Sequence, residues 1–166
     1  YVLETGTHKG IGASYMGMGL KDNKTGRLTT VEFIPEIHAE AVSRINTLGL
    51  QEIVNCKLMD IRSFNPPQNY QMILLDTEPQ TRFGELLKFY PYLDEGGYIF
   101  IHDLHRHMGQ INQNPDHPNE PFWPWGPVPE AIKLLVKAGM LKPFHFPTPR
   151  GLTGFYKTHA GDYKWG

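Results

Sequence analysis

The chain has 166 residues, 40% of them hydrophobic, which is enough for one domain with one sizeable core. Its 16 Lys and Arg against 17 Asp and Glu give a net charge of -1, which excludes the strongly basic surface that binds nucleic acid or anionic membranes. The single cysteine, Cys56, excludes an internal disulfide and suits a reducing compartment such as the cytoplasm, and no apolar run reaches the roughly 20 residues that span a bilayer.

Strand and helix patterns alternate through the first part of the chain. Strand patterns are short β-branched or apolar runs, and helix patterns repeat apolar residues every three or four positions. They predict strands over 1–4, 27–33, 52–59, 70–76 and 97–102, and helices over 10–20, 35–48 and 81–93. Because Tyr1 is not a natural first residue and already belongs to a strand pattern, we expect a further segment to precede it.

The second part opens with an irregular insertion, residues 104–128, rich in proline, asparagine and aromatic residues. We expect it to form a lid over an acceptor site, although a satellite core or a subunit contact in a homo-oligomer are open alternatives. A helix over 129–138 and strands over 142–146 and 151–158 follow. We therefore predict one α/β domain over 1–166, a Rossmann-like, doubly wound, mostly parallel sheet of about seven strands with an antiparallel hairpin at its C-terminal edge.

Acidic residues recur where predicted strands end. In a parallel sheet these carboxyl ends share one edge, and ligands bind there at the switch point of the strand order. Carboxylates are costly to bury without partners, and glycine in the first turn lets the backbone approach a ligand closely. These acids are Glu4, Glu32, Asp60 and Asp76. They favour a site for a polar, partly cationic ligand over a tight turn that binds nothing.

The run Glu4-Thr5-Gly6-Thr7-His8-Lys9-Gly10 resembles the acid-x-Gly-x-x-x-Gly loop of class I S-adenosylmethionine-dependent methyltransferases, with His8 replacing a frequent glycine. "ILLDTEP…GGYIFIHD" further resembles the metal-dependent O-methyltransferases of the catechol type and of sugar and antibiotic modification. The resemblance covers roughly residues 2–103 and implies S-adenosylmethionine as the cofactor, with its ribose on Glu32 and its adenine beside Asp60. The cofactor-binding residues that it implies are Glu4, Gly6, Thr7, Gly10, Glu32, Phe33, Asp60, Ile61 and Asp76.

A nicotinamide dinucleotide enzyme is the main rival for the glycine-rich turn. Its Gly-x-Gly-x-x-Gly fingerprint needs a second glycine beside the pyrophosphate. Aligned from Gly6, this chain has His8 at that position, and aligned from Gly10 it lacks the third glycine. The sequence therefore favours the methyl donor over the dinucleotide.

The same resemblance implies a divalent metal held by Asp76, after the fourth strand, and Asp103, after the fifth. Carboxylates suit magnesium, manganese or calcium, and such an ion would lower the pKa of acceptor oxygens. Two positions depart from the catechol type: Leu104 replaces an asparagine ligand and Pro79 replaces a catalytic lysine. His102 is then a candidate third ligand, while the alternative is that both aspartates cap strand ends and meet water.

The acceptor base is predicted among residues that follow the fourth and fifth strands. His105 has an intrinsic pKa suited to neutral pH, whereas Glu78 would need a raised pKa or metal assistance. We predict O-methylation of a small polar acceptor such as a sugar, a phenol or a natural-product intermediate. Two alternatives stay open, a catalytically idle nucleoside-binding domain and a metal-dependent hydroxylase or hydrolase that uses the histidines from His102 to His107.

Overall fold

The fold is taken from a computed structural model, which describes residues 1–102, 129–146 and 152–160. Within these ranges the strands are β1 (Val2–Thr5), β2 (Leu28–Glu32), β3 (Val54–Leu58), β4 (Tyr70–Leu75), β5 (Leu93–His102), β6 (Leu141–Phe146) and β7 (Leu152–Lys157). The α-helices are α1 (Ile11–Asp22), α2 (Pro35–Thr47), α3 (Arg82–Phe89) and α4 (Glu130–Lys137), and 3-10 turns lie at η1 (Ile61–Ser63), η2 (Pro79–Thr81) and η3 (Tyr90–Tyr92). None of these helices is long and apolar enough to cross a membrane.

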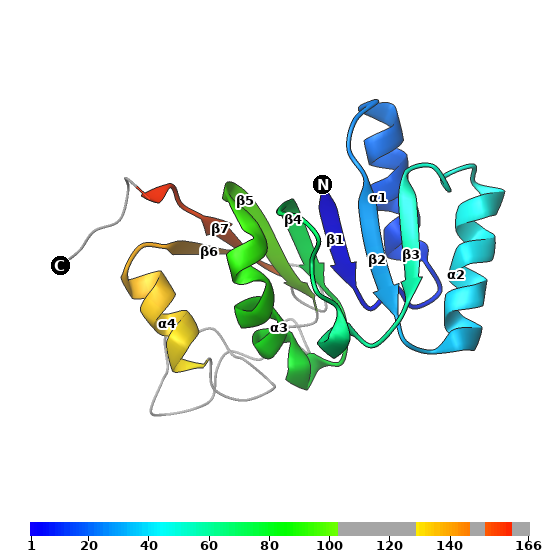
Figure 1. The fold of residues 1–166 in the computed structure, drawn as a ribbon. Coiled ribbons are helices and arrows are strands. Elements are labelled where there is room, and N and C mark those ends of the chain that lie inside the picture. Colours follow the sequence, from blue (N-terminus) through cyan, green and yellow to red (C-terminus); the bar gives the residue numbers. More distant parts are fainter. Residues whose placement is uncertain (103–128, 147–151, 161–166) are drawn as a thin grey trace.

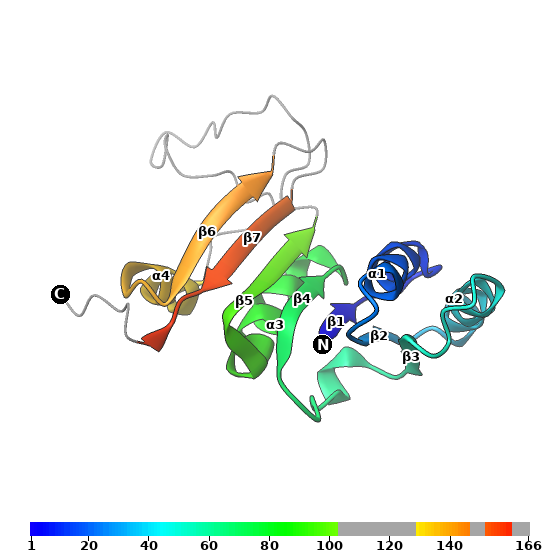
Figure 2. The ribbon, with the colours of Figure 1, turned by 90° about the horizontal axis from the view of Figure 1, so that it is seen from above.

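The strands form one sheet in the order β3-β2-β1-β4-β5-β7-β6. Strands β1 to β5 pair in parallel, and the predicted Rossmann-like doubly wound architecture is confirmed. Seen from above in Figure 2, α1 and α2 cover one face of the sheet and α3 and α4 cover the other. The carboxyl ends of β1, β2 and β3 meet at the lower edge in Figure 1. Since the strand order reverses between β1 and β4, this edge contains the switch point at which ligands bind in such sheets.

The predicted antiparallel hairpin at the C-terminal edge of the sheet is confirmed. Strand β7 runs antiparallel to both neighbours and lies between β5 and β6. Pro143 has no backbone N–H to donate, so β6 suits an edge position. Phe155 of β7 is buried and pairs with Ile99 of β5, so the more buried strand of the hairpin lies inside the sheet.

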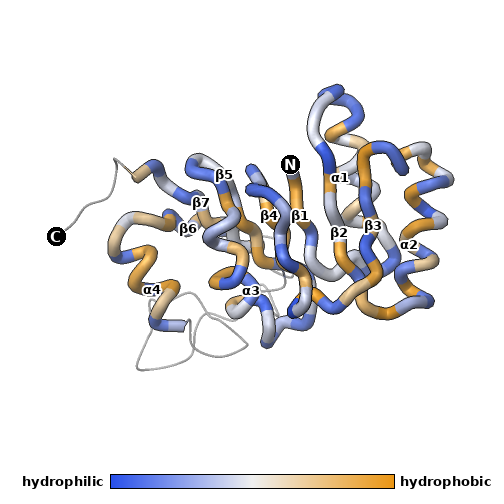
Figure 3. Tube along the Cα trace, viewed as in Figure 1, coloured by the Kyte–Doolittle hydropathy of each residue, from blue (hydrophilic) through white to orange (hydrophobic). Residues whose placement is uncertain are grey.

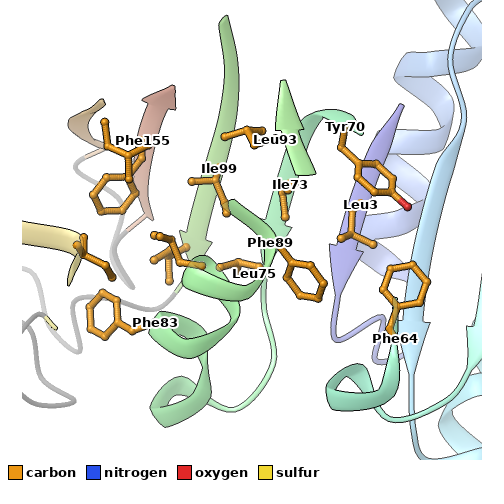
Figure 4. Packing of buried hydrophobic residues seen from close by; sticks show 14 of the residues in the cluster. Leu3, Phe64, Tyr70, Ile73, Leu75, Phe83, Phe89, Leu93, Ile99 and Phe155 are labelled. Atoms are coloured by element: carbon orange, nitrogen blue, oxygen red, sulfur yellow. The ribbon is translucent and has the colours of Figure 1, made fainter. Parts of the chain in front are cut away.

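Two hydrophobic clusters hold the helices against the sheet. The larger one joins β1, β4, β5 and β7 to α3 and α4, and Figure 4 shows Phe89 of α3 beside Leu75 of the sheet. The smaller one lies under α1 and α2 on the other face and contains Ala13, Leu28, Ile45, Leu50 and Val54. In Figure 3, α2 alternates between hydrophobic and hydrophilic segments, as expected for a helix with one buried face.

One boundary differs clearly from the sequence prediction. The helix expected over 81–93 ends as an α-helix at Phe89 and continues as the 3-10 turn η3, which contains Pro91. A proline inside a helix removes one backbone donor and disfavours a further α-turn. Strand β5 then begins at Leu93, four residues before the predicted start at Gly97.

Candidate functional site

The loop between β1 and α1 folds back onto β2. The amides of Gly6 and Thr7 both donate to the carbonyl oxygen of Val31, at 3.0 and 3.1 Å. Gly6 and Gly10 have φ angles of 79° and 76°, in the left-handed region that favours glycine. A Cβ on Gly6 would also clash with the backbone carbonyl of Asp76. Backbone conformation and packing therefore require these glycines even without a ligand. The loop brings β1, β2 and β4 together at the edge.

Glu32 ties this loop to the end of β2. Its side chain is buried, with 6% of the residue exposed. Its Oε2 accepts the N–H of His8 at 2.9 Å, and its Oε1 accepts the N–H groups of Phe33 and Ile34 at 2.9 and 3.0 Å. A carboxylate offers about four acceptor sites, so it can still accept a hydroxyl. The sequence motif did not reveal this second, structural role of Glu32.

Glu4 lies behind the loop with only 2% of its surface exposed. Its Oε2 accepts the hydroxyl of Thr30 at 2.6 Å, and Thr30 in turn lies 2.5 Å from the hydroxyl of Thr7. Burial raises the pKa of Glu4 to about 8, against the lowering effect of the Thr30 hydrogen bond, and the charge of Asp76 raises it further. A carboxyl with this pKa is largely protonated at neutral pH, and a cation beside it would stabilise the ionised form.

The end of β3 supplies a different kind of acid. Asp60 caps η1 by accepting the N–H of Arg62 at 2.8 Å, and the Arg62 guanidinium holds both of its oxygens, with Nε at 3.1 and 3.0 Å. These hydrogen bonds lower the pKa of Asp60 to about 2. Ile61, the first residue of η1, is half-buried, and Phe33 at the end of β2 is 64% exposed. Phe33 therefore presents an aromatic side chain to solvent at this edge.

The ends of β4 and β5 are joined by a buried arginine. Arg82, the first residue of α3, is 3% exposed, and its Nη2 donates to Asp76 Oδ1 at 3.2 Å. Its Nε donates to the carbonyl oxygen of Thr77 at 2.8 Å, and its Nη1 donates to the carbonyl oxygen of His102. The Nδ1 of His102 lies 2.9 Å from the same Asp76 Oδ1. The predicted residues Asp76 and His102 are therefore brought together, with a guanidinium between their strands.

A buried glutamate supports this arrangement from the first turn of α3. Glu85 accepts the hydroxyl of Thr5 at 2.6 Å and the hydroxyls of Thr81, at 3.1 Å, and Thr77. Sequence analysis missed both Glu85 and Arg82. A signal existed, because positions 82, 85, 86 and 89 have the i, i+3, i+4, i+7 spacing of one helix face, and Leu86 and Phe89 on that face are buried.

The predicted metal ligands Asp76 and His102 meet, but they form no cation site with a third ligand in the part of the chain that the structure describes. There, no group of three or more His, Cys, Asp and Glu side chains could hold an ion, and Asp103 lies outside the described residues. Asp76 and His102 bind each other, and the oxygen that they share also receives Arg82. Asp76 and His102 in this geometry do not fit a shared metal site.

Of the two predicted bases, the structure describes only one. Glu78 is exposed between β4 and α3, two residues after Asp76, and its backbone carbonyl accepts the hydroxyl of Thr81 at 2.8 Å. Its position at the carboxyl edge agrees with a place on the acceptor side. His105, like the predicted lid over 104–128, lies outside the described residues.

Comparison with known proteins bears on the family and on the fold of this chain. Residues 3–104 match the sequence model of a family described as "Methyltransferase domain", whereas no curated protein matches the chain. The structure is similar to the O-methyltransferase TomG from Streptomyces achromogenes, involved in tomaymycin synthesis, in complex with S-adenosylmethionine (TM-score 0.73, 18% identity, 95% of this chain and 73% of that chain).

Two further solved structures are similar to the same extent. One is an O-methyltransferase from Bacillus cereus in complex with S-adenosylhomocysteine (TM-score 0.71, 18% identity, 94% of this chain and 73% of that chain). The other is described as a putative caffeoyl-CoA O-methyltransferase from Staphylococcus aureus (TM-score 0.71, 17% identity, 94% of this chain and 75% of that chain). At these identities the likeness establishes a shared fold.

Proposed function

Because the chain belongs to the methyltransferase-domain family, we propose that it transfers a methyl group from S-adenosylmethionine to an oxygen of a small polar acceptor. The observation that carries the proposal is the meeting of Glu4, Glu32 and the glycine loop at the switch point of the sheet. A dinucleotide would instead need a glycine at the position of His8.

Each end of the proposed cofactor has a matching group at this edge. Glu32 would accept a ribose hydroxyl, and Phe33, Asp60 and Ile61 would flank the adenine. The methionine end would lie near the glycine loop and Glu4. Its ammonium and sulfonium are cations, so they would lower the pKa of Glu4 and hold it ionised. The site thus combines a hydroxyl acceptor with a carboxyl that responds to positive charge.

The acceptor side would lie at the ends of β4 and β5. Methyl transfer is an in-line displacement in which the carbon–sulfur bond breaks as the new carbon–oxygen bond forms, and the bound cofactor supplies the electrophilic carbon. The acceptor must lose its proton to a base, for which Glu78 and His105 are the candidates. The structural neighbours described as O-methyltransferases support oxygen as the target, and a sugar, a phenol or a natural-product intermediate is the expected acceptor class.

Calorimetry with S-adenosylmethionine, S-adenosylhomocysteine and NAD tests the donor assignment directly. We expect saturable binding of the first two ligands and none of NAD in the same concentration range. Binding of NAD alone would refute the proposal. Tight binding of S-adenosylmethionine without transfer to any of a panel of sugars, phenols and natural-product intermediates would favour the idle nucleoside-binding alternative.

A further inference from the structure

We infer that Arg82 occupies the place in which a divalent cation would join the ends of β4 and β5, so that the reaction proceeds without a metal ion on Asp76. The conclusion that methyl transfer needs no metal rests on the proposed function. The placement of Arg82 between the ends of β4 and β5 rests only on its geometry. The inference also replaces our expectation of a metal held jointly by Asp76 and His102.

The partners of Arg82 among the described residues are oxygen atoms of the types that hard cations prefer. Its guanidinium reaches a carboxylate oxygen of Asp76 at 3.2 Å, the carbonyl oxygen of Thr77 at 2.8 Å, and the carbonyl oxygen of His102. Carboxylates and backbone carbonyls are also the usual ligands of calcium and manganese. A guanidinium satisfies the same oxygens with fixed, planar geometry and stays charged at every physiological pH.

Burial makes this arrangement hard to displace. The Arg82 side chain is 4% exposed, whereas the Asp76 side chain is 34% exposed. An ion that approached Asp76 from solvent would meet a positive charge already bonded to it. Glu85 holds Thr77 and Thr81 at the start of α3, and this network fixes the part of the backbone from which Arg82 projects.

Titration of the full chain with Mn²⁺ alone, followed by electron paramagnetic resonance of the free ion, tests the inference without any acceptor. The relevant quantity is the Mn²⁺ binding that is lost in Asp76→Asn. In the wild-type protein we expect the dissociation constant of this binding to exceed about 1 mM, which is weaker than protein calcium sites. In Arg82→Gln, which removes the cation and keeps a polar side chain, we expect it to become at least about tenfold tighter.

Arg62→Gln is the matched control, because Arg62 forms an exposed pair with Asp60 at the same sheet edge. It should leave the Asp76-dependent Mn²⁺ affinity at its wild-type value. The inference would be overturned if the wild-type protein bound Mn²⁺ with a dissociation constant below about 100 µM and Asp76→Asn abolished that binding. An Arg82→Gln protein that is folded by circular dichroism yet binds Mn²⁺ no better than wild type would also overturn it.

If Arg82→Gln does not fold, the comparison of wild type with Asp76→Asn decides by itself. Calorimetry with S-adenosylhomocysteine on the same wild-type protein keeps the two proposals apart. Loss of that binding would refute the proposed function and leave the assignment of Arg82 intact. Once an acceptor is known, turnover should be unchanged in excess chelator, and turnover that disappears and returns with Mn²⁺ would contradict metal-free transfer.

Discussion

Replacing Glu4 by glutamine should remove a large pH dependence of the free energy of unfolding. Burial raises the pKa of Glu4 from 4.5 to about 8 in the folded protein, and the unfolded chain returns to the ordinary value. Between these two values the folded protein holds a proton that the unfolded chain has lost. The stabilisation is therefore fully present below pH 4.5 and is lost as the pH rises through 8.

The size of the effect follows from the difference between the two pKa values. At about 1.36 kcal/mol for each unit, the upper limit is about 5 kcal/mol. The N-terminus of α1 lies close to the carboxyl, since a Cβ on Gly12 would be 2.5 Å from Glu4 Oε1. Its dipole favours the ionised form, so we expect roughly 2–5 kcal/mol.

Urea unfolding at about pH 5 and about pH 8 measures this difference. Because these two pH values span only part of the titration, the wild-type protein should lose roughly 2–3.5 kcal/mol more between them than Glu4→Gln. Glu52→Gln, which changes an exposed glutamate outside the site, should behave like the wild type. An identical pH dependence in wild type and Glu4→Gln would show that the carboxyl does not hold its proton in the folded state, and the reasoning would fail.

Three further substitutions test the edge of the sheet, and a fourth, in α3, is a control. Glu32→Ala should weaken S-adenosylmethionine binding in calorimetry by roughly 1.5–3 kcal/mol, because a charged acceptor is lost; unchanged affinity would remove Glu32 from the cofactor site. His8→Gly should raise the free energy of unfolding by up to about 1 kcal/mol, since His8 has a φ of 48° that glycine adopts without strain; a loss of stability in urea would contradict this. Gly6→Ala should destabilise by roughly 2–4 kcal/mol through its clash with the Asp76 carbonyl, whereas Gly84→Ala, with open space on an exposed helix position, should stabilise by about 0.5–1 kcal/mol; equal effects of the two alanines would refute the packing argument.

The sequence by itself determined the alternation of elements and the edge at which the acids gather. Runs of β-branched residues and helical spacing are local signals, so they identify strands and helices without knowledge of their neighbours. Parallel strands joined by helices must all present their carboxyl ends to one edge. For this reason Glu32, the last residue of β2, and Asp76, directly after β4, could be assigned to a common site before any tertiary structure was known.

Only the tertiary structure decided how those acids are used. Arg82 reaches the carbonyl oxygen of His102, 20 residues away, and Glu85 accepts a hydroxyl from Thr5, 80 residues away. The same holds for β7, which pairs with β5 across the large insertion. Local patterns specify that such residues are polar or buried, but hydrogen bonds between distant segments depend on which strands become neighbours. That choice follows from the packing of the whole sheet, and it places the Arg82 guanidinium between Asp76 and the end of β5.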